Sequence, residues 1–234
     1  MTAERLPRLD PGVTLLRRPS ARATALHRLV VAALGRRPDA SARWVDARGD
    51  AVTHALYDLA PSRARLDDLR VARAFTAHQH HALVRRVVRE DSAVDLVVAP
   101  AVAAPYRDDD LHPGEAEDLL AATLALLRAH GDLGARVLVS ACRDDQRATR
   151  VADVADATVR AERTAMGWAY DAPGFETRVY HGDGWWQTTV PYWVALCGAV
   201  PEPRRRDLPR RTAGDVAGDA GAESGAGVAT LEGF

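Results

Sequence analysis

Short apolar runs alternate with amphipathic segments along the first 150 residues of the chain. The short, nearly all-apolar runs predict strands, over 13–16, 44–47, 69–74, 94–102 and 136–141. Between them, apolar residues recur every three or four positions, which predicts helices over 21–34 and 53–60, a helix from residue 76 and one from residue 113. Strands that alternate with helices in this way predict an α/β fold, with a mainly parallel sheet flanked by helices.

Several predicted helices carry start and stop signals. Ser20 is placed to cap the first helix and Gly35 to end it. Thr76 and Gln79 have the spacing of a capping box at the start of the third. The fourth begins at Pro113 with acidic residues in its first turn, and Arg128, His130 and then Gly131 stand at its end.

From residue 154 the pattern changes to strands without helices. They are predicted over 154–162, 175–180, 185–189 and 192–197, with a hairpin turn at 181–184. This part is expected to add antiparallel hairpin strands at one edge of the sheet. Residues 201–234 are rich in Arg, Gly, Ala and Asp, so we expect a core domain over 1–200 followed by a flexible tail.

Composition excludes several kinds of chemistry. The 31 basic residues are all arginine, which removes any lysine-dependent phosphate loop or Schiff base. A net charge of −1 provides no global basic field for nucleic acid. Two cysteines without a CxxC pair exclude a disulfide framework and a four-cysteine zinc site. Because there is neither a long apolar run nor a signal-peptide core, we expect a cytoplasmic protein that does not contact membranes.

The first strand–helix junction is where folds of this class place a phosphate loop. Residues 17–24 have the length of such a loop, but only Thr24 keeps its residue type. Arg17 and Arg22 stand at the glycine positions and Ala23 at the lysine position. Read alone, the segment is an ordinary strand–helix turn.

Residues 12–29 are followed at matching distances by LRVARAFTAHQ at 69–79 and VDLVVAPAVAAPYR at 94–107. Together with WVDARG at 44–49, these stretches resemble the core ATPase domain of the RecA/RadA recombinase family, in particular its shorter RadB-like members. The resemblance spans about residues 12–145 and implies a RecA-like fold of the P-loop NTPase superfamily. Another doubly wound α/β fold is the alternative.

The same resemblance implies that the ATPase chemistry is lost. Arg48 stands where the family has its attacking-water glutamate, Ala99 where it has its magnesium-side aspartate, and Ala141 and Cys142 where it has a sensor Asn-Gln pair. Phosphoryl transfer depends on such groups. We therefore expect a pseudoenzyme without a nucleotide cofactor or metal, an accessory of DNA recombination or repair that binds an active recombinase through the shared sheet edge. The alternative is a nucleotide-binding regulator or unusual ATPase that holds phosphate through Arg17, Arg18 and Arg22.

Other candidate sites each have a structural alternative. The resemblance implies a weak DNA contact at Arg143, Arg147 and Arg150, against a solvated helix start. Exposed indoles at Trp185 and Trp186 would contact a partner or single-stranded bases, against a hairpin whose rings cover the sheet edge. The polar clusters considered as metal ligands are His78, His80 and His81, and Asp108 to Asp110. A polar helix end and a solvated loop explain them, so we expect no metal there. Cys142 is either a nucleophile at a strand end or a buried free thiol.

Overall fold

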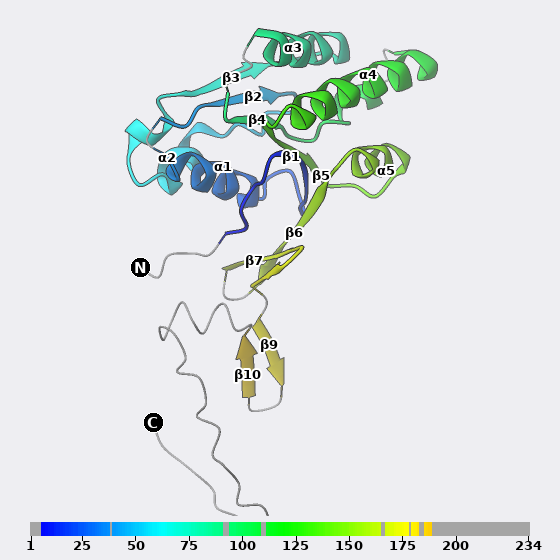
Figure 1. The fold of residues 1–234 in the computed structure, drawn as a ribbon. Coiled ribbons are helices and arrows are strands. Elements are labelled where there is room, and N and C mark those ends of the chain that lie inside the picture. The colour runs from blue at the N-terminus through cyan, green and yellow to red at the C-terminus, as the bar shows by residue number, and fades with distance from the viewer. Residues whose placement is uncertain are drawn as a thin grey trace, which may run out of the picture. The chain divides into compact units, whose positions relative to one another are not determined.

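The computed structural model describes residues 6–37, 39–90, 94–108, 111–164 and 167–177, and the backbone of 179–182 and 185–188. Its main feature is an eight-stranded sheet with the order β3-β2-β4-β5-β1-β6-β7-β8 (Figure 1). The strands are β1 (Gly12–Arg17), β2 (Ala42–Asp46), β3 (Leu69–Arg73), β4 (Leu96–Ala99), β5 (Arg136–Ala141), β6 (Ala157–Thr164), β7 (Gly167–Ala172) and β8 (Phe175–Glu176). A separate two-stranded antiparallel sheet joins β9 (Val179–Gly182) to β10 (Trp185–Thr188).

The first six strands run parallel, and β7 and β8 complete the sheet in antiparallel pairing. The connections contain α1 (Ala25–Gly35), α2 (Thr53–Leu59), η1 (Arg63–Leu66), α3 (Ala77–Glu90), η2 (Pro105–Arg107), α4 (Pro113–Asp132) and α5 (Gln146–Asp153). The chain leaves β1 for the β2–β3 side of the sheet and later returns across β1 to reach β6. The crossover direction therefore reverses beside β1, the kind of switch point where open α/β sheets bind ligands.

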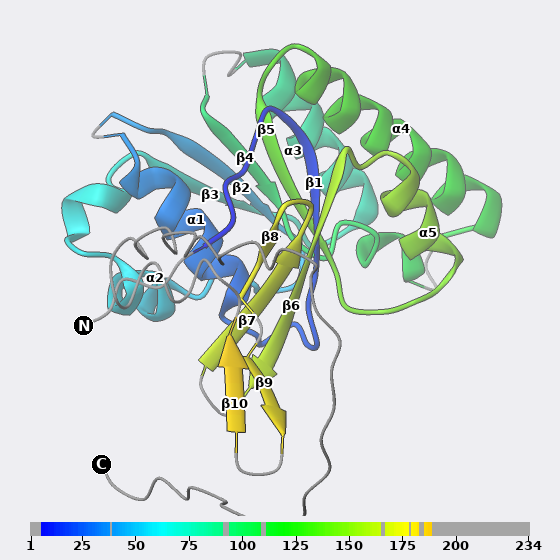
Figure 2. The ribbon, with the colours of Figure 1, turned by 60° about the horizontal axis from the view of Figure 1, so that its bottom comes forward.

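Each face of the sheet has its own apolar core. On one face α1 and α2 pack on Leu16, Trp44 and Leu138; on the other, α3, α4 and α5 pack on Leu15 and Val139 (Figure 2). Neighbouring residues of one strand point to opposite faces. A strand covered on both sides must therefore be apolar throughout, as the buried run Leu96–Ala99 is.

The predicted α/β class, with a mainly parallel sheet flanked by helices, is confirmed. The predicted capping box is present in part: the Thr76 hydroxyl accepts the Gln79 N–H, but the Gln79 side chain accepts the N–H of Phe75 in place of that of Thr76. Gly131 was predicted to end the fourth helix but lies inside α4. A Cβ there would come within 3.1 Å of the Gly12 backbone, so glycine permits close packing of α4 on β1.

Other element bounds differ from the prediction. The first helix begins at Ala25 because Ser20 takes part in a turn in which its carbonyl accepts the Ala23 N–H. The strand expected over 94–102 ends at Ala99, where the chain turns through Ala101. The strand predicted from residue 154 is β6, and it starts at Ala157. The sequence pattern predicted neither α5 nor β7.

The antiparallel edge strands also differ in identity from the prediction. They are β7 and β8. The predicted hairpin is present as the antiparallel pair β9–β10, but that pair forms a separate sheet, and β8 takes the start of the strand predicted over 175–180. The predicted strand over 192–197 and the predicted tail over 201–234 lie outside the described residues. Within the part of the chain that the structure describes, no helix has the length and apolar character needed to cross a membrane.

A buried polar network fastens α3, η2 and α4 together. The Tyr106 hydroxyl lies 2.9 Å from Nδ1 of His80 and 2.7 Å from the Thr123 hydroxyl, which also hydrogen-bonds Nδ1 of His81. His80 is fully buried. Burial lowers the pKa of His80 to about 4 and raises that of Tyr106 to about 12, so both groups are neutral at pH 7.

The buried His80 should make folding pH-dependent. Between pH 6.5 and 4 the unfolded chain binds a proton at this position and the folded chain does not, so stability falls as the pH falls. From pH 7 to 4.5 the free energy of unfolding should drop by about 2–3 kcal/mol from this group. Urea unfolding at both pH values measures this. The fall in the free energy of unfolding from pH 7 to 4.5 should be smaller in His80→Asn than in the wild type by that amount. The control His54→Asn changes an exposed histidine and should retain the wild-type drop; an equal drop in His80→Asn would contradict the assignment.

Candidate functional site

An arginine is buried at the carboxyl end of β1, at the start of the predicted phosphate loop. The Arg18 side chain is 0% exposed and its Nη2 lies 2.7 Å from Oδ1 of Asp50, which is 1% exposed. The same guanidinium donates to the Ser140 hydroxyl at 3.2 Å and to the Ala21 carbonyl at 2.6 Å. One cation thus joins the ends of β1 and β5 to the loop after β2.

The loop from Arg17 to Thr24 does not form a phosphate cradle. Such a cradle needs successive N–H groups turned toward one point, with some residues in the left-handed conformation. No residue of 17–24 has a positive φ, and the Ala23 N–H donates to Ser20 instead. The Thr24 hydroxyl, in the position that would face magnesium, accepts the Trp168 indole N–H at 3.1 Å.

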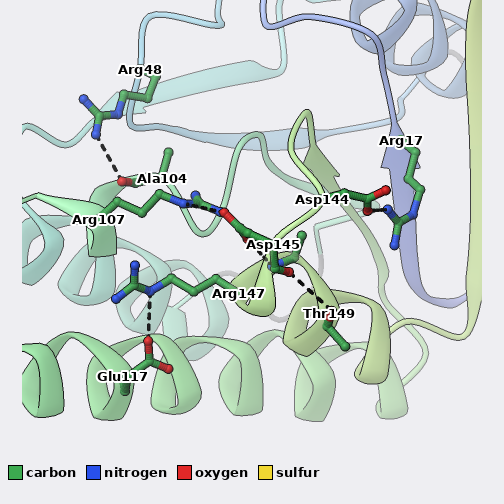
Figure 3. Close-up of polar contacts among 10 residues, drawn as sticks. Arg17, Arg48, Ala104, Arg107, Glu117, Asp144, Asp145, Arg147 and Thr149 are labelled. Carbon is green, nitrogen blue, oxygen red and sulfur yellow. Dashed lines mark hydrogen bonds and ion pairs between the residues drawn. The ribbon is translucent and has the colours of Figure 1, made fainter.

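The arginines of the loop have separate positions. Arg17 is ion-paired with the exposed Asp144, while Arg22 is exposed (Figure 3 shows the Arg17 pair). With Arg18 buried against Asp50, the three guanidinium groups proposed to hold phosphate do not converge on one open site. The loop geometry therefore gives no support to the phosphate-gripping alternative.

A pocket of about 480 Å³ opens at the carboxyl edge of the sheet, beside the switch point at β1 and β5. Its floor is made of small side chains that follow β4 and β5, and its polar lining consists mostly of arginine. The lining residues are Ala21, Arg48, Ala101, Ala103, Ala104, Arg107, Asp108, Ser140, Ala141, Cys142, Arg143 and Ala148. We refer to this site as the carboxyl-edge pocket.

Loops held by ion pairs form the walls of the carboxyl-edge pocket (Figure 3). Arg107 makes a two-pronged contact with the Asp145 carboxylate. Its Nε donates to Oδ2 at 3.0 Å, and its Nη2 donates to Oδ2 at 2.6 Å and to Oδ1 at 2.8 Å. Asp145 also caps α5 by accepting the Ala148 N–H at 2.8 Å. Desolvation by itself would raise the pKa of the Asp145 carboxyl. The hydrogen bond from the Ala148 N–H and the Arg107 guanidinium outweigh it, so the pKa is lowered. Arg48 donates to the Ala104 carbonyl at 3.1 Å and to Asp108 at 2.6 Å.

The backbone at the mouth of this pocket is strained at one residue. Ala101 has φ 45°, and among the described residues no other non-glycine has a positive φ. Its N–H donates to the Ser140 hydroxyl at 2.9 Å, the same hydroxyl that Arg18 contacts. The turn after β4 is therefore tied to the buried Arg18–Asp50 pair.

The structure brings together three of the four positions at which the resemblance implies lost ATPase groups. Arg48, Ala141 and Cys142 all line the carboxyl-edge pocket, whereas Ala99 is fully buried in the core beneath it. Partial desolvation raises the pKa of the Cys142 thiol, so it is protonated at neutral pH. That is the opposite of the activated thiolate that a nucleophile requires. Cys142 is exposed, which corrects the expectation of a buried thiol.

The arginines proposed to contact DNA are divided between two environments. Arg147 and Arg150 both pair with Glu117 of α4, at 2.9 Å and 2.7 Å, and so fasten α5 to α4. Arg143 lines the pocket and forms no ion pair or hydrogen bond with any described residue. Of the three, Arg143 is the one whose guanidinium is not engaged by a carboxylate.

Of the remaining candidate side chains that the structure describes, Asp108 lines the pocket, and the three histidines do not. His78 lies 3.3 Å from Glu115, while His80 and His81 belong to the buried network. Among the described residues, no group of three or more His, Cys, Asp or Glu side chains is arranged to hold a metal ion. Trp185 and Trp186 belong to β10, but their side chains lie outside the described residues, as do Asp109 and Asp110.

Sequence reasoning did not identify Asp50, Ser140 or the Arg107–Asp145 pair. Asp50 is one of 32 acidic residues, and no local pattern marks it as the partner of a residue 32 positions away. Ser140 is the one polar residue among the four buried positions of β5 (137–140), which is the one signal that could have drawn attention to it.

No protein-family model matches this chain, and a search of curated proteins finds no matching sequence.

The buried ion pair leads to a stability prediction. Arg18→Met leaves the Asp50 carboxylate buried without its cation, so it should lower the free energy of unfolding by about 3–5 kcal/mol. Arg18→Met with Asp50→Leu removes both charges and should recover most of that loss. Arg17→Met is the matched control, because its pair with the exposed Asp144 is worth less than about 1 kcal/mol. Urea denaturation measures all three; a loss in Arg18→Met no larger than in Arg17→Met would contradict the role of the pair.

Proposed function

We propose that this protein is a non-hydrolysing RecA-fold accessory of DNA recombination or repair, which acts by binding a RecA/RadA-type recombinase. The observation that carries the proposal is the loop after β1. Members of the RecA/RadA family bind a nucleotide at this place, but the loop of this chain has neither a phosphate cradle nor an available cation array, and Arg18 is buried in its own ion pair. A chain with this loop serves as a scaffold better than as an ATPase.

The exposed edge of the sheet supports a binding role. β3 is the last strand on its side, so one of its backbone edges has no partner in the sheet. Phe75 follows β3 and is 82% exposed, with its N–H held at 2.9 Å by the Gln79 side chain. Val71 of β3 and Tyr57 of α2 are also exposed, and both line an adjoining groove of about 400 Å³.

An unpaired strand edge is a common site for addition of a strand from another protein. Large exposed apolar side chains next to it provide anchors for such a partner. The sequence-based alternative, a contact through Trp185 and Trp186, concerns side chains outside the described residues and stays a prediction. We therefore place the recombinase-binding surface at β3 and Phe75 in this proposal.

The first test concerns nucleotide. Mg·ATP should be hydrolysed no faster by this protein than by buffer, and it should give no rise in Tm that depends on Arg22. A binder at a hundredfold excess over Kd would add about 2.7 kcal/mol, a shift of about 5–10 °C for a chain of this size. A shift that Arg22→Ala abolishes would instead support the nucleotide-binding alternative.

The second test concerns the partner surface. Purified recombinase from the source organism should bind the immobilised protein, and Phe75→Ala should weaken binding at least tenfold because it removes an exposed anchor. Leu133→Ala is the matched control, since Leu133 is 86% exposed but follows α4, away from β3. Biolayer interferometry measures both. Equal affinities of the wild type and Phe75→Ala would place the contact elsewhere, and absence of wild-type binding would overturn the proposed partner.

A further inference from the structure

We propose that the carboxyl-edge pocket binds a small, compact phosphorylated molecule, with Arg143 as its principal ligand. This inference goes beyond the proposed function and does not depend on the RecA resemblance. It rests on the charge, the unused hydrogen-bond donors and the shape of the pocket.

The charge of the lining favours an anion. Three arginines line the pocket, but Asp108 pairs with Arg48, and Asp145, outside the lining, pairs with Arg107. The charge of Arg143 is the one that no carboxylate of the described residues compensates. Cys142 adds no negative charge, because its thiol is protonated at neutral pH. The formal charge of the lining is therefore positive, although the net charge of the whole chain is −1.

The arginines that line the pocket also have N–H donors that make no hydrogen bond to a described residue. A guanidinium has five N–H donors. Arg48 uses only Nη2 for Ala104 and Asp108, and Arg107 uses Nε and Nη2 for Asp145, so each retains an Nη1 group without a partner among the described residues. These two side chains are fixed in place by their ion pairs, which lowers the entropy cost of binding a ligand.

Arg143 differs from its neighbours because it has no ion-pair or hydrogen-bond partner among the described residues. An unpaired arginine in a concave pocket is available for a two-pronged contact with phosphate. Alanines at 101, 103, 104, 141 and 148 also line the pocket, and their small side chains leave room for a ligand.

The shape favours a small molecule over nucleic acid. A pocket of about 480 Å³ matches the size of small-molecule sites and lies at the switch point of the sheet. The basic residues that would extend the surface for a DNA backbone, Arg147 and Arg150, are both occupied by Glu117.

The experiment measures binding of pyrophosphate to the full chain by isothermal titration calorimetry, at constant ionic strength set with NaCl. We expect saturable one-to-one binding, and a rise in Tm of about 3–6 °C at ten times the Kd. Arg143→Ala should weaken the affinity at least tenfold. Arg89→Ala is the matched control, because Arg89 is also exposed and without a partner among the described residues but lies at the end of α3, outside the pocket lining.

Three outcomes would overturn the inference: no saturable binding to the wild type, binding that Arg143→Ala leaves unchanged, or binding of a single-stranded oligonucleotide through Arg143 when pyrophosphate does not bind. Unfolding curves of Arg143→Ala without ligand should match the wild type, which separates lost binding from lost folding. If pyrophosphate binding is lost in Arg22→Ala but kept in Arg143→Ala, the anion binds at the loop after β1. That result contradicts this inference, whereas the proposed function fails in a different experiment, when the recombinase does not bind.

Discussion

A guanidinium inside a protein must have its charge balanced and its donors satisfied, and this requirement organises the carboxyl edge of the sheet. Arg18 meets it with Asp50, Ser140 and the Ala21 carbonyl, which come from three separate segments of the chain. Ser140 in turn accepts the N–H of Ala101 and so helps to hold that residue in a left-handed conformation. The interaction thereby sets the positions of the loops that surround the carboxyl-edge pocket.

Asp46, at the end of β2, performs a related task. Its buried carboxylate accepts the N–H groups of Asp50 at 2.9 Å and Ala51 at 3.3 Å, which fixes the turn that presents Asp50 to Arg18. Buried carboxylates and their donors thus form a chain of contacts from the end of β2 to the end of β1. These internal contacts structure the space in front of the first helix.

Two neighbouring parts of the carboxyl edge of the sheet differ in whether their charged groups are available to a ligand. At the loop after β1, charges are paired and buried, and the helix start is engaged by Trp168 through Thr24. At the pocket beyond it, the side chains are small, and arginines with unused donors line the space. Under the inference above, a fold whose loop after β1 forms no phosphate cradle offers an anion site beside that loop, because the crevice itself comes from the reversal of the crossovers.

The periodicity of apolar residues was enough to predict the class of fold and most of its first five strands, because burial on both faces of a parallel sheet requires an uninterrupted apolar run such as that of β4. The same periodicity did not predict β7 or α5, because these elements are short and contain too few apolar residues to differ from a loop. Nor did it reveal that Gly131 lies inside α4, since that depends on the distance between a helix and the Gly12 backbone.

By itself the sequence determined which chemistry is missing: without lysine, and with arginine at the loop's glycine positions, no ordinary phosphate loop can form. Only the tertiary structure decided which arginines are occupied and which remain available. Arg18, Arg107, Arg147 and Arg143 are alike in sequence. Their differing roles depend on carboxylates that lie 32, 38 and 30 positions away for the first three, and on the lack of any among the described residues for the fourth. A charge finds its partner through space, and the distance along the chain carries no record of it.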